Sequence, residues 1–322
     1  MTTAARDISL DAIRDASRFV YRAAVRTPLV RIDVPAAGDG IDLYLKLEVL
    51  QPIGSFKIRG AVNVLRQLTA HDLADGVWTV SAGNAALGVA YAARQAGVPC
   101  SVMVMDTAPA AKIDAINRLG ATIVPVTYDE AWNTVERHAS DRMRGYFIHP
   151  FDDDRFIAGN ATAALEIFDD LPDVDAIVGS VGGGGLLSGV VAAARAIRPQ
   201  TKVFAAEPET AAPLSASLSA GRPMYFAGWR ASFVDGAGGK SVLDTMWPLL
   251  REVSGSIVVT LDDVARAIRV VAERAHVIAE GAAGCAVAGA LGGRAGRGKI
   301  VAIVSGGNID LSRFFEIIKS SD

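Results

Sequence analysis

The chain alternates short apolar runs with helical patterns along almost its whole length. The runs are continuous and not alternating in polarity, as is typical of strands that are covered on both faces. Strands and helices in turn predict an α/β protein with mostly parallel sheets. We expect strands over Tyr44–Glu48, Trp78–Ser81, Cys100–Met105, Thr122–Val126, Ala176–Val181, Val203–Ala206 and Ile300–Val304. We expect helices over Leu10–Val25, Phe56–Leu68, Leu87–Ala96, Ala110–Leu119, Asp129–Arg142, Ala161–Asp169, Leu186–Ile197, Ala211–Ala220, Leu261–Ala279 and Ala282–Leu291.

The length of 322 residues is sufficient for two domains with separate cores. No linker rich in Ser, Gly or Pro separates two halves, and no repeat of fixed period is visible. We expect residues 46–146 to form a smaller domain. Residues 1–45 and 147–322 would then form a larger, discontinuous domain that binds most of the ligand.

Charge and composition exclude several classes of protein. The net charge of −3, with both signs mixed along the chain, argues against nucleic acid or an anionic membrane as the main partner. No apolar run has transmembrane length, and the N-terminus lacks a signal-peptide core, so we expect a cytoplasmic protein. The two cysteines and the four histidines form no disulfide framework and no metal-ligand spacing.

Lys57 has an unusual predicted position. A strand ending near Glu48 is followed by the turn Gln51–Gly54 and then by a helix, for which Ser55 is a plausible N-cap. Lys57 would therefore lie in the first helical turn, where the helix dipole disfavours a cation. That environment lowers the pKa of an amine, and a neutral amine can form a Schiff base. The alternative is an ordinary solvated lysine.

The segment Gly182–Gly185 lies between a predicted strand and a predicted helix. Glycines there allow the backbone to approach a ligand, and the N–H groups at a helix N-terminus favour an anion such as phosphate. No Lys-Ser/Thr pair follows, so the segment is not a P-loop. A dinucleotide site is an alternative, because Glu207 ends the next strand at a suitable distance. Ser188, however, occupies the place of the third glycine in that fingerprint.

Two similar turns follow other predicted strands, Ser81–Asn84 and Ser305–Asn308. In an open α/β sheet, polar groups at the carboxyl ends of parallel strands mark the ligand crevice. Each turn alone could be structural. Together with Lys57 and the glycine segment, they predict one phosphorylated ligand beside an amine. Pyridoxal 5'-phosphate (PLP) needs a lysine, an anion site and a partner for its ring nitrogen.

The chain resembles the serine/threonine dehydratase family of PLP-dependent enzymes, within the β-family of tryptophan synthase β and cysteine synthase. The motifs that carry this resemblance are Ser55–Ala61, Ser81–Asn84, His149–Asp152, Gly182–Gly185, Glu207–Glu209 and Ser305–Asn308. The resemblance implies a tryptophan synthase β-like fold with two open, mostly parallel sheets covered by helices. It also implies a homo-oligomer, which we expect to be a homodimer.

The resemblance also implies roles for individual residues. Lys57 would form the Schiff base and then move the Cα proton, and Phe56 would pack beside the cofactor ring. Asn84 would bond the ring hydroxyl, and Ser305 would face the pyridine nitrogen. The phosphate would be held by Gly182, Gly183, Gly184, Gly185 and the N–H group of Leu186. The substrate would contact the turn Ser81, Ala82, Gly83, Asn84 and Ala85, with Gly236 on the other side.

Three positions depart from the family pattern. Ala82 stands where serine racemases have a serine that acts on the second face of Cα, so we expect little racemisation. Ala85 replaces a histidine, which leaves more room beside the substrate. Pro213 stands six residues after Glu207, where the family's divalent-cation site has an aspartate, so we expect no metal.

The function implied is that of an ammonia-lyase, which converts a β-hydroxy L-amino acid to a 2-oxo acid and ammonia. L-Threonine and L-serine are the first candidates, and 3-phenylserine or 3-hydroxyaspartate are the alternatives. Ser305 cannot keep the ring nitrogen protonated as a carboxylate would, which favours elimination over transamination. A nicotinamide-dependent oxidoreductase and a non-catalytic binding protein are the alternatives from other classes.

Overall fold

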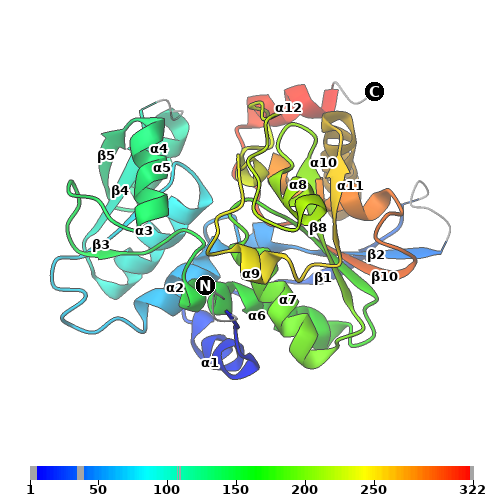
Figure 1. Ribbon diagram of the computed structural model, residues 1–322, viewed down its shortest axis with the longest axis horizontal. Coiled ribbons are helices and arrows are strands. Elements are labelled where there is room, and N and C mark those ends of the chain that lie inside the picture. Colours follow the sequence, from blue (N-terminus) through cyan, green and yellow to red (C-terminus); the bar gives the residue numbers. More distant parts are fainter. Residues whose placement is uncertain (1–5, 35–39, 107, 109, 320–322) are drawn as a thin grey trace.

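Two open sheets, each covered by helices, organise the protein (Figure 1). The computed structural model describes residues 6–34, 40–106, 108 and 110–319. A six-stranded sheet has the order β1-β2-β10-β7-β8-β9, and a four-stranded sheet has the order β5-β4-β3-β6. All neighbouring strands pair in parallel except β1 and β2. The predicted α/β class with two mostly parallel sheets is therefore confirmed.

The strands and helices have the following bounds. The six-stranded sheet contains β1 (Leu29–Ile32), β2 (Ile41–Lys46), β7 (Ala176–Ser180), β8 (Lys202–Pro208), β9 (Gly255–Val259) and β10 (Gly298–Ile303). The four-stranded sheet contains β3 (Val77–Val80), β4 (Cys100–Met105), β5 (Thr122–Val126) and β6 (Tyr146–Phe147). The helices are α1 (Leu10–Val20), α2 (Lys57–Leu65), α3 (Asn84–Ala96), α4 (Ala110–Arg118), α5 (Tyr128–Arg137), α6 (Asp154–Asp170), α7 (Gly185–Ile197), α8 (Pro213–Ala220), α9 (Trp247–Leu250), α10 (Leu261–Ala275), α11 (Gly281–Leu291) and α12 (Leu311–Lys319), with short 3-10 turns η1 (Glu48–Leu50) and η2 (Asp235–Ala237).

The six-stranded sheet has a separate apolar core on each face. Helices α1, α6 and α7 cover one face, while α10, α11 and α12 cover the other, as the lower and upper right of Figure 1 show. Helix α11 is buried on nearly every side, since its sequence of glycines, alanines and other small residues lets it lie close to its neighbours. At Gly284, for example, a Cβ would lie 2.5 Å from the side chain of Ile268.

Helix α2 is held in place by a closed set of buried charges. Arg59 on α2 donates to Glu48 Oε1 and Oε2 at 2.7 Å each and to Glu166 Oε1 at 2.7 Å. Lys46 Nζ donates to the second oxygen of Glu166 at 2.5 Å and to the Thr27 carbonyl at 2.6 Å. All four charged side chains are at most 1% exposed, and the two cations balance the two carboxylates. This network joins α2 to the end of β2 and to α6, and it therefore fixes the helix that begins at Lys57.

Several elements differ from the sequence-based expectation. Helix α6 begins at Asp154, earlier than the predicted Ala161, because the Asp153 side chain accepts the N–H groups of Arg155 and Phe156. Helices α5 and α10 end earlier than predicted, because His138 and His276 adopt left-handed φ values of 56°. The expectation missed β1, β6, β9, α9 and α12. No helix in the described ranges has both the length and the apolar character to cross a membrane.

Candidate active site

One cavity of about 810 Å³ lies where the carboxyl ends of β3, β7 and β10 come together. It brings together every residue that the sequence analysis assigned to cofactor or substrate. These are Phe56, Lys57, Ser81, Ala82, Gly83, Asn84, Ala85, Gly182, Gly183, Gly184, Gly185, Leu186, Gly236 and Ser305. The turns between strands and helices thus converge from both sheets, as expected for a ligand crevice in an α/β protein.

Lys57 is the first residue of α2 and lies on the cavity wall. Its Nζ donates to the Pro150 carbonyl at 2.6 Å and lies 5.3 Å from the ring centroids of Phe56 and Phe156. Burial disfavours the ammonium form and lowers the pKa of Lys57 to about 8. The predicted position in the first turn is confirmed, and a neutral amine is accessible near neutral pH.

The predicted N-cap at Ser55 is wrong. Phe56 occupies the N-cap position of α2 in a helical conformation, and no side chain caps the helix there. Ser55 instead forms an isolated β-bridge with Gly306. The Phe56 N–H donates to the Ser305 carbonyl at 3.1 Å, and the Gly307 N–H donates to the Gly54 carbonyl at 2.9 Å. This pairing is what places Lys57 beside the turn that carries Ser305.

The glycine segment before α7 forms an open backbone cradle. A Cβ at Gly183 would lie 2.2 Å from the Phe151 ring, and one at Gly182 would lie 2.6 Å from the Gly236 carbonyl. Gly184 has a φ of +92°, which favours glycine. Among the described residues, the N–H groups of residues 182–187 donate to no other backbone group. Free N–H groups at the start of a 13-residue helix suit a phosphate.

Asn84 lies in a hydrogen-bond network that the sequence analysis missed. Its Nδ2 donates to Glu280 Oε1 at 2.7 Å, and its Oδ1 accepts from Asn308 Nδ2 at 2.7 Å. Burial, followed by the negative charge of Asp235, raises the pKa of Glu280 to about 7. Glu280 lies 196 residues from Asn84 in sequence, and no local pattern marks it as a site residue.

Glu207 does not act as a free acid in this protein. Its carboxylate accepts the N–H groups of Leu214 and Ser215 at 2.8 and 2.7 Å and the Ser256 hydroxyl at 2.6 Å. These bonds attach Glu207 to the start of α8, where Pro213 is the first residue. Both oxygens are therefore engaged, which fits neither a ribose hydroxyl nor the cation site of the family.

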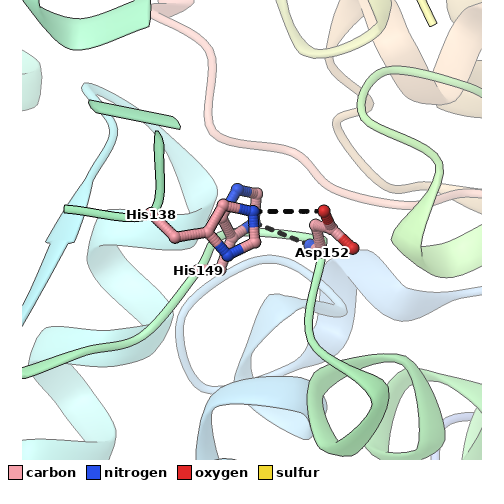
Figure 2. A group of neighbouring side chains, drawn as sticks. All are labelled: His138, His149 and Asp152. Atoms are coloured by element: carbon pink, nitrogen blue, oxygen red, sulfur yellow. Dashed lines mark hydrogen bonds and ion pairs between the residues drawn. The ribbon is translucent and has the colours of Figure 1, made fainter. Parts of the chain in front are cut away.

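His138, His149 and Asp152 are the described side chains whose ligand atoms cluster closely enough for a metal ion (Figure 2). The spacing of the histidines in the sequence did not predict this cluster. His149 Nδ1, however, accepts the N–H groups of Asp152 and Phe151 at 2.7 and 3.3 Å, and Nε2 lies 3.2 Å from the Val135 carbonyl. Both ring nitrogens are thus used, with the proton assigned to Nε2. Asp152 is paired with Arg6 at 2.5 Å. His138 Nε2 lies 3.2 Å from the second oxygen of Asp152. This arrangement braces the turn that presents Pro150 to Lys57.

Comparison with known proteins identifies the family. A family model described as "Pyridoxal-phosphate dependent enzyme" matches residues 20–306. The chain belongs to this family of PLP-dependent enzymes. It is 39% identical to an L-threonine ammonia-lyase of Thermotoga maritima over 97% of its own length and 78% of that protein. It is 34% identical to a serine racemase of Dictyostelium discoideum over 97% and 98% of the two chains. The structure of maize serine racemase matches with a TM-score of 0.88 and 31% identity over 98% of each chain.

Membership of this family makes PLP the cofactor and confirms the tryptophan synthase β-like fold. The residues present fit PLP, since the cavity combines an amine of lowered pKa with a cradle of free N–H groups. The family match gives the nicotinamide-dependent alternative no support, and Glu207 does not line the cavity. The relatives carry the names of two different reactions, so the residues of this chain must distinguish between them.

Proposed function

We propose that this protein is a PLP-dependent ammonia-lyase acting on L-threonine or L-serine. The observation that carries the proposal is Ala82, which lines the same cavity as Lys57 and lies in the turn that would bind the substrate carboxylate. Racemisation needs a proton acceptor on each face of Cα, and an alanine methyl cannot be one. Elimination needs an acceptor on one face only, and Lys57 supplies it.

When bound, PLP supplies the electron sink that makes the substrate Cα–H bond acidic. The roles proposed for the protein are binding, orientation and proton transfer. The segment Gly182–Gly185 and the Leu186 N–H hold the phosphate, and Phe56 lies beside the ring. Ser305, which is 3% exposed, faces the ring nitrogen with a neutral hydroxyl, which does not keep that nitrogen protonated as a carboxylate would. N–H groups of the Ser81–Ala85 turn hold the substrate carboxylate.

Lys57 moves the proton in this proposal. Its amine, in the neutral form that a pKa of about 8 makes accessible, takes the proton from Cα, and the resulting ammonium gives that proton to the β-hydroxyl, which leaves as water when the Cβ–O bond breaks. The Pro150 carbonyl, which accepts from Nζ at 2.6 Å, holds the amine when it is free. Water then hydrolyses the released enamine. The net change is loss of water and its re-addition, so one amino acid gives one 2-oxo acid and one ammonia.

The test is to incubate the purified holoenzyme with L-threonine and L-serine and to measure ammonia, 2-oxo acid and the D-enantiomer. We expect equal amounts of ammonia and 2-oxo acid, with D-serine at a few per cent of turnover or less. The Ala82→Ser variant restores a hydroxyl on the second face and should raise the ratio of D-serine to keto acid. Rapid formation of D-serine by the wild-type enzyme, without keto acid, would contradict the proposal.

A second candidate is the dehydration of a bulkier or acidic β-hydroxy amino acid, such as 3-phenylserine or 3-hydroxyaspartate. Ala85 favours it, because this small side chain lies on the cavity wall where the family carries a histidine. Lys112 also lines the cavity and is paired there with Asp235. Comparing kcat/KM for the four substrates, in wild type and in Ala85→His, distinguishes the candidates. Ala85→His should lower the rate on 3-phenylserine far more than the rate on serine.

We further propose that residues 46–146 form a smaller domain beside a larger one of residues 1–45 and 147–322, and that the protein is a cytoplasmic homodimer. The four-stranded sheet lies within or next to residues 46–146, from Val77 to Phe147.

Sedimentation equilibrium of the purified holoenzyme tests the dimer, for which a single species of twice the chain mass is expected. A monomer at micromolar concentration would contradict it.

A further inference from the structure

Glu280 is a buried carboxyl group on the cavity wall to which the roles above give no task. It precedes α11 and is only 5% exposed. Its backbone N–H donates to the Gly306 carbonyl at 3.0 Å, and the N–H of Asn308 donates to its side chain. A buried carboxyl is unfavourable unless it is hydrogen-bonded, so its remaining bond, to Asn84, is informative.

The orientation of Asn84 follows from a chain of donors and acceptors. The Ile53 carbonyl can only accept, so Asn308 must present its NH₂ group to it, at 2.8 Å. The same NH₂ group donates to Asn84 at 2.7 Å, so Asn84 must present its carbonyl oxygen there. Its own NH₂ group is then turned toward Glu280 Oε1, which accepts at 2.7 Å. The positions of oxygen and nitrogen in both amides thus follow from the Ile53 carbonyl, which can only accept a hydrogen bond.

The network uses one of the two N–H bonds on Asn84 Nδ2. No partner for the second is found in the described part of the chain, and Asn84 lines the cavity. An amide N–H is the group needed to bind a ring oxygen. If the amide were rotated by half a turn, its carbonyl oxygen would replace this donor and would repel that oxygen. Glu280 disfavours the rotated state, because two acceptors would then face each other.

We propose that Glu280 and Asn308 are positioning residues, which fix the Asn84 amide so that one N–H remains available to the cofactor ring oxygen. The inference rests on the proposed role of Asn84 in binding PLP. Neither residue needs to touch the substrate. Glu280 disfavours the rotated amide as a carboxylate, and the NH₂ group of Asn308 requires the Asn84 carbonyl oxygen in either protonation state of Glu280.

The test measures the dissociation constant of PLP and the position of the visible absorption maximum at one pH. The variants are Glu280→Met, Glu280→Gln, Asn84→Ala and the double variant Glu280→Met/Asn84→Ala. Loss of one well-formed hydrogen bond weakens binding by about tenfold, so Glu280→Met should raise the dissociation constant by about that factor and shift the maximum. Glu280→Gln keeps the size and an acceptor oxygen, and it should remain within about threefold of wild type on the same hydrogen-bond scale.

The double variant is decisive. If Glu280 acts through Asn84, the double variant binds PLP no more weakly than Asn84→Ala, within about twofold. If the two effects multiply, Glu280 acts in another way and the proposal is wrong. Glu207→Met is the matched control, because Glu207 is equally buried but lies outside the cavity. It should lower thermal stability and leave PLP binding unchanged, and an effect equal to that of Glu280→Met would also overturn the proposal.

Two further outcomes are separable. Should Glu280→Met not fold, Asn308→Ala tests the same network from the other side and should weaken PLP binding in the same way. Normal PLP binding and an unshifted maximum in Asn308→Ala would then contradict the proposal. Failure of the wild-type protein to bind PLP through Lys57 would instead refute the proposed function, before any variant is compared.

Discussion

Replacing Arg59 with methionine should destabilise the protein far more than an ordinary surface change. The substitution removes one of two cations from a network with two carboxylates, all at most 1% exposed. Lys46 then faces Glu48 and Glu166 alone, and one buried negative charge is left without compensation. Methionine has a similar length, so packing changes little and the loss is mainly electrostatic.

The expected magnitude follows from the burial of the network. Breaking a buried ion pair by removing one partner costs about 3–5 kcal/mol of unfolding free energy. With about 2.1 cal/mol/K of unfolding entropy per residue, a chain of 322 residues loses about 4–7 °C in its unfolding midpoint. Arg31→Met is the matched control, since Arg31 and Asp42 form a surface pair with exposures of 63% and 44%. Such pairs contribute at most about 1 kcal/mol.

The assay is thermal unfolding of the holoprotein followed by circular dichroism, at pH 7 and pH 5. Adding Glu48→Gln to Arg59→Met restores the charge balance, so the double variant should be more stable than Arg59→Met alone. The pKa of Glu166 is lowered in the wild type, because Arg59 and Lys46 outweigh the opposing effect of burial. The stability that Glu166 contributes in the wild type is therefore still present at pH 5 and is lost only below its ordinary pKa of 4.5, whereas the uncompensated carboxylate of the variant gains a proton at higher pH. The difference in unfolding midpoint between the wild type and Arg59→Met should therefore be smaller at pH 5 than at pH 7. The reasoning is refuted if Arg59→Met loses no more than Arg31→Met, or if Glu48→Gln makes it worse.

Three further predictions concern the cavity and its surroundings. Gly183→Ala would place a Cβ 2.2 Å from the Phe151 ring. Distortion of the cradle at a cost of about 1–3 kcal/mol should weaken PLP binding by about 5- to 150-fold in a fluorescence titration. Gly292→Ala, where the nearest atom lies at 3.5 Å, is the control and should have no effect. Activity should be the same in magnesium and in EDTA, because Glu207 already binds the start of α8, and a clear rise with magnesium would contradict that assignment. Burial, and then the nearby His138, lowers the pKa of His149 to about 4, so stability should fall as the pH drops below its ordinary pKa of about 6.5. In His149→Asn the loss of stability between about pH 6.5 and pH 4 should be smaller than in the wild type. If the unfolding midpoint of the variant depends on pH as steeply as that of the wild type, His149 does not titrate in this range.

Strands in the middle of the sheets were predictable because their residues are apolar on both faces. The expected strand Cys100–Met105 has the observed bounds of β4, and the expected strand Ala176–Val181 extends one residue beyond β7. The edge strand β5 was also expected with its observed bounds, because most residues of Thr122–Val126 are β-branched. The missed strands β1 and β9 lie at the edges of the six-stranded sheet and are only partly buried. The order of apolar and polar residues in these edge strands depends on which other segments cover them, and the neighbouring residues in the sequence do not show this. The ends of α5 and α10 were missed because histidines, not glycines, adopt the left-handed conformation there.

The wall of the cavity was predictable because its residues lie in turns that follow strands. Residues that follow parallel strands lie at the same edge of the sheet, whatever the details of the packing. This holds for the glycines, Asn84 and Ser305. Glu280 and the charge network around Arg59 were not predictable, because each depends on partners far away in sequence. Buried charges look like surface charges until their partners are known.

Lys57 is the residue that we propose binds PLP covalently. The most direct measurement is borohydride reduction of the holoenzyme, followed by peptide mass spectrometry to locate the phosphopyridoxyl group. We expect one modified residue, Lys57, in the wild type. In Lys57→Ala we expect no modification and no visible absorption band. Modification of a different lysine, or undiminished ammonia release by Lys57→Ala, would contradict it.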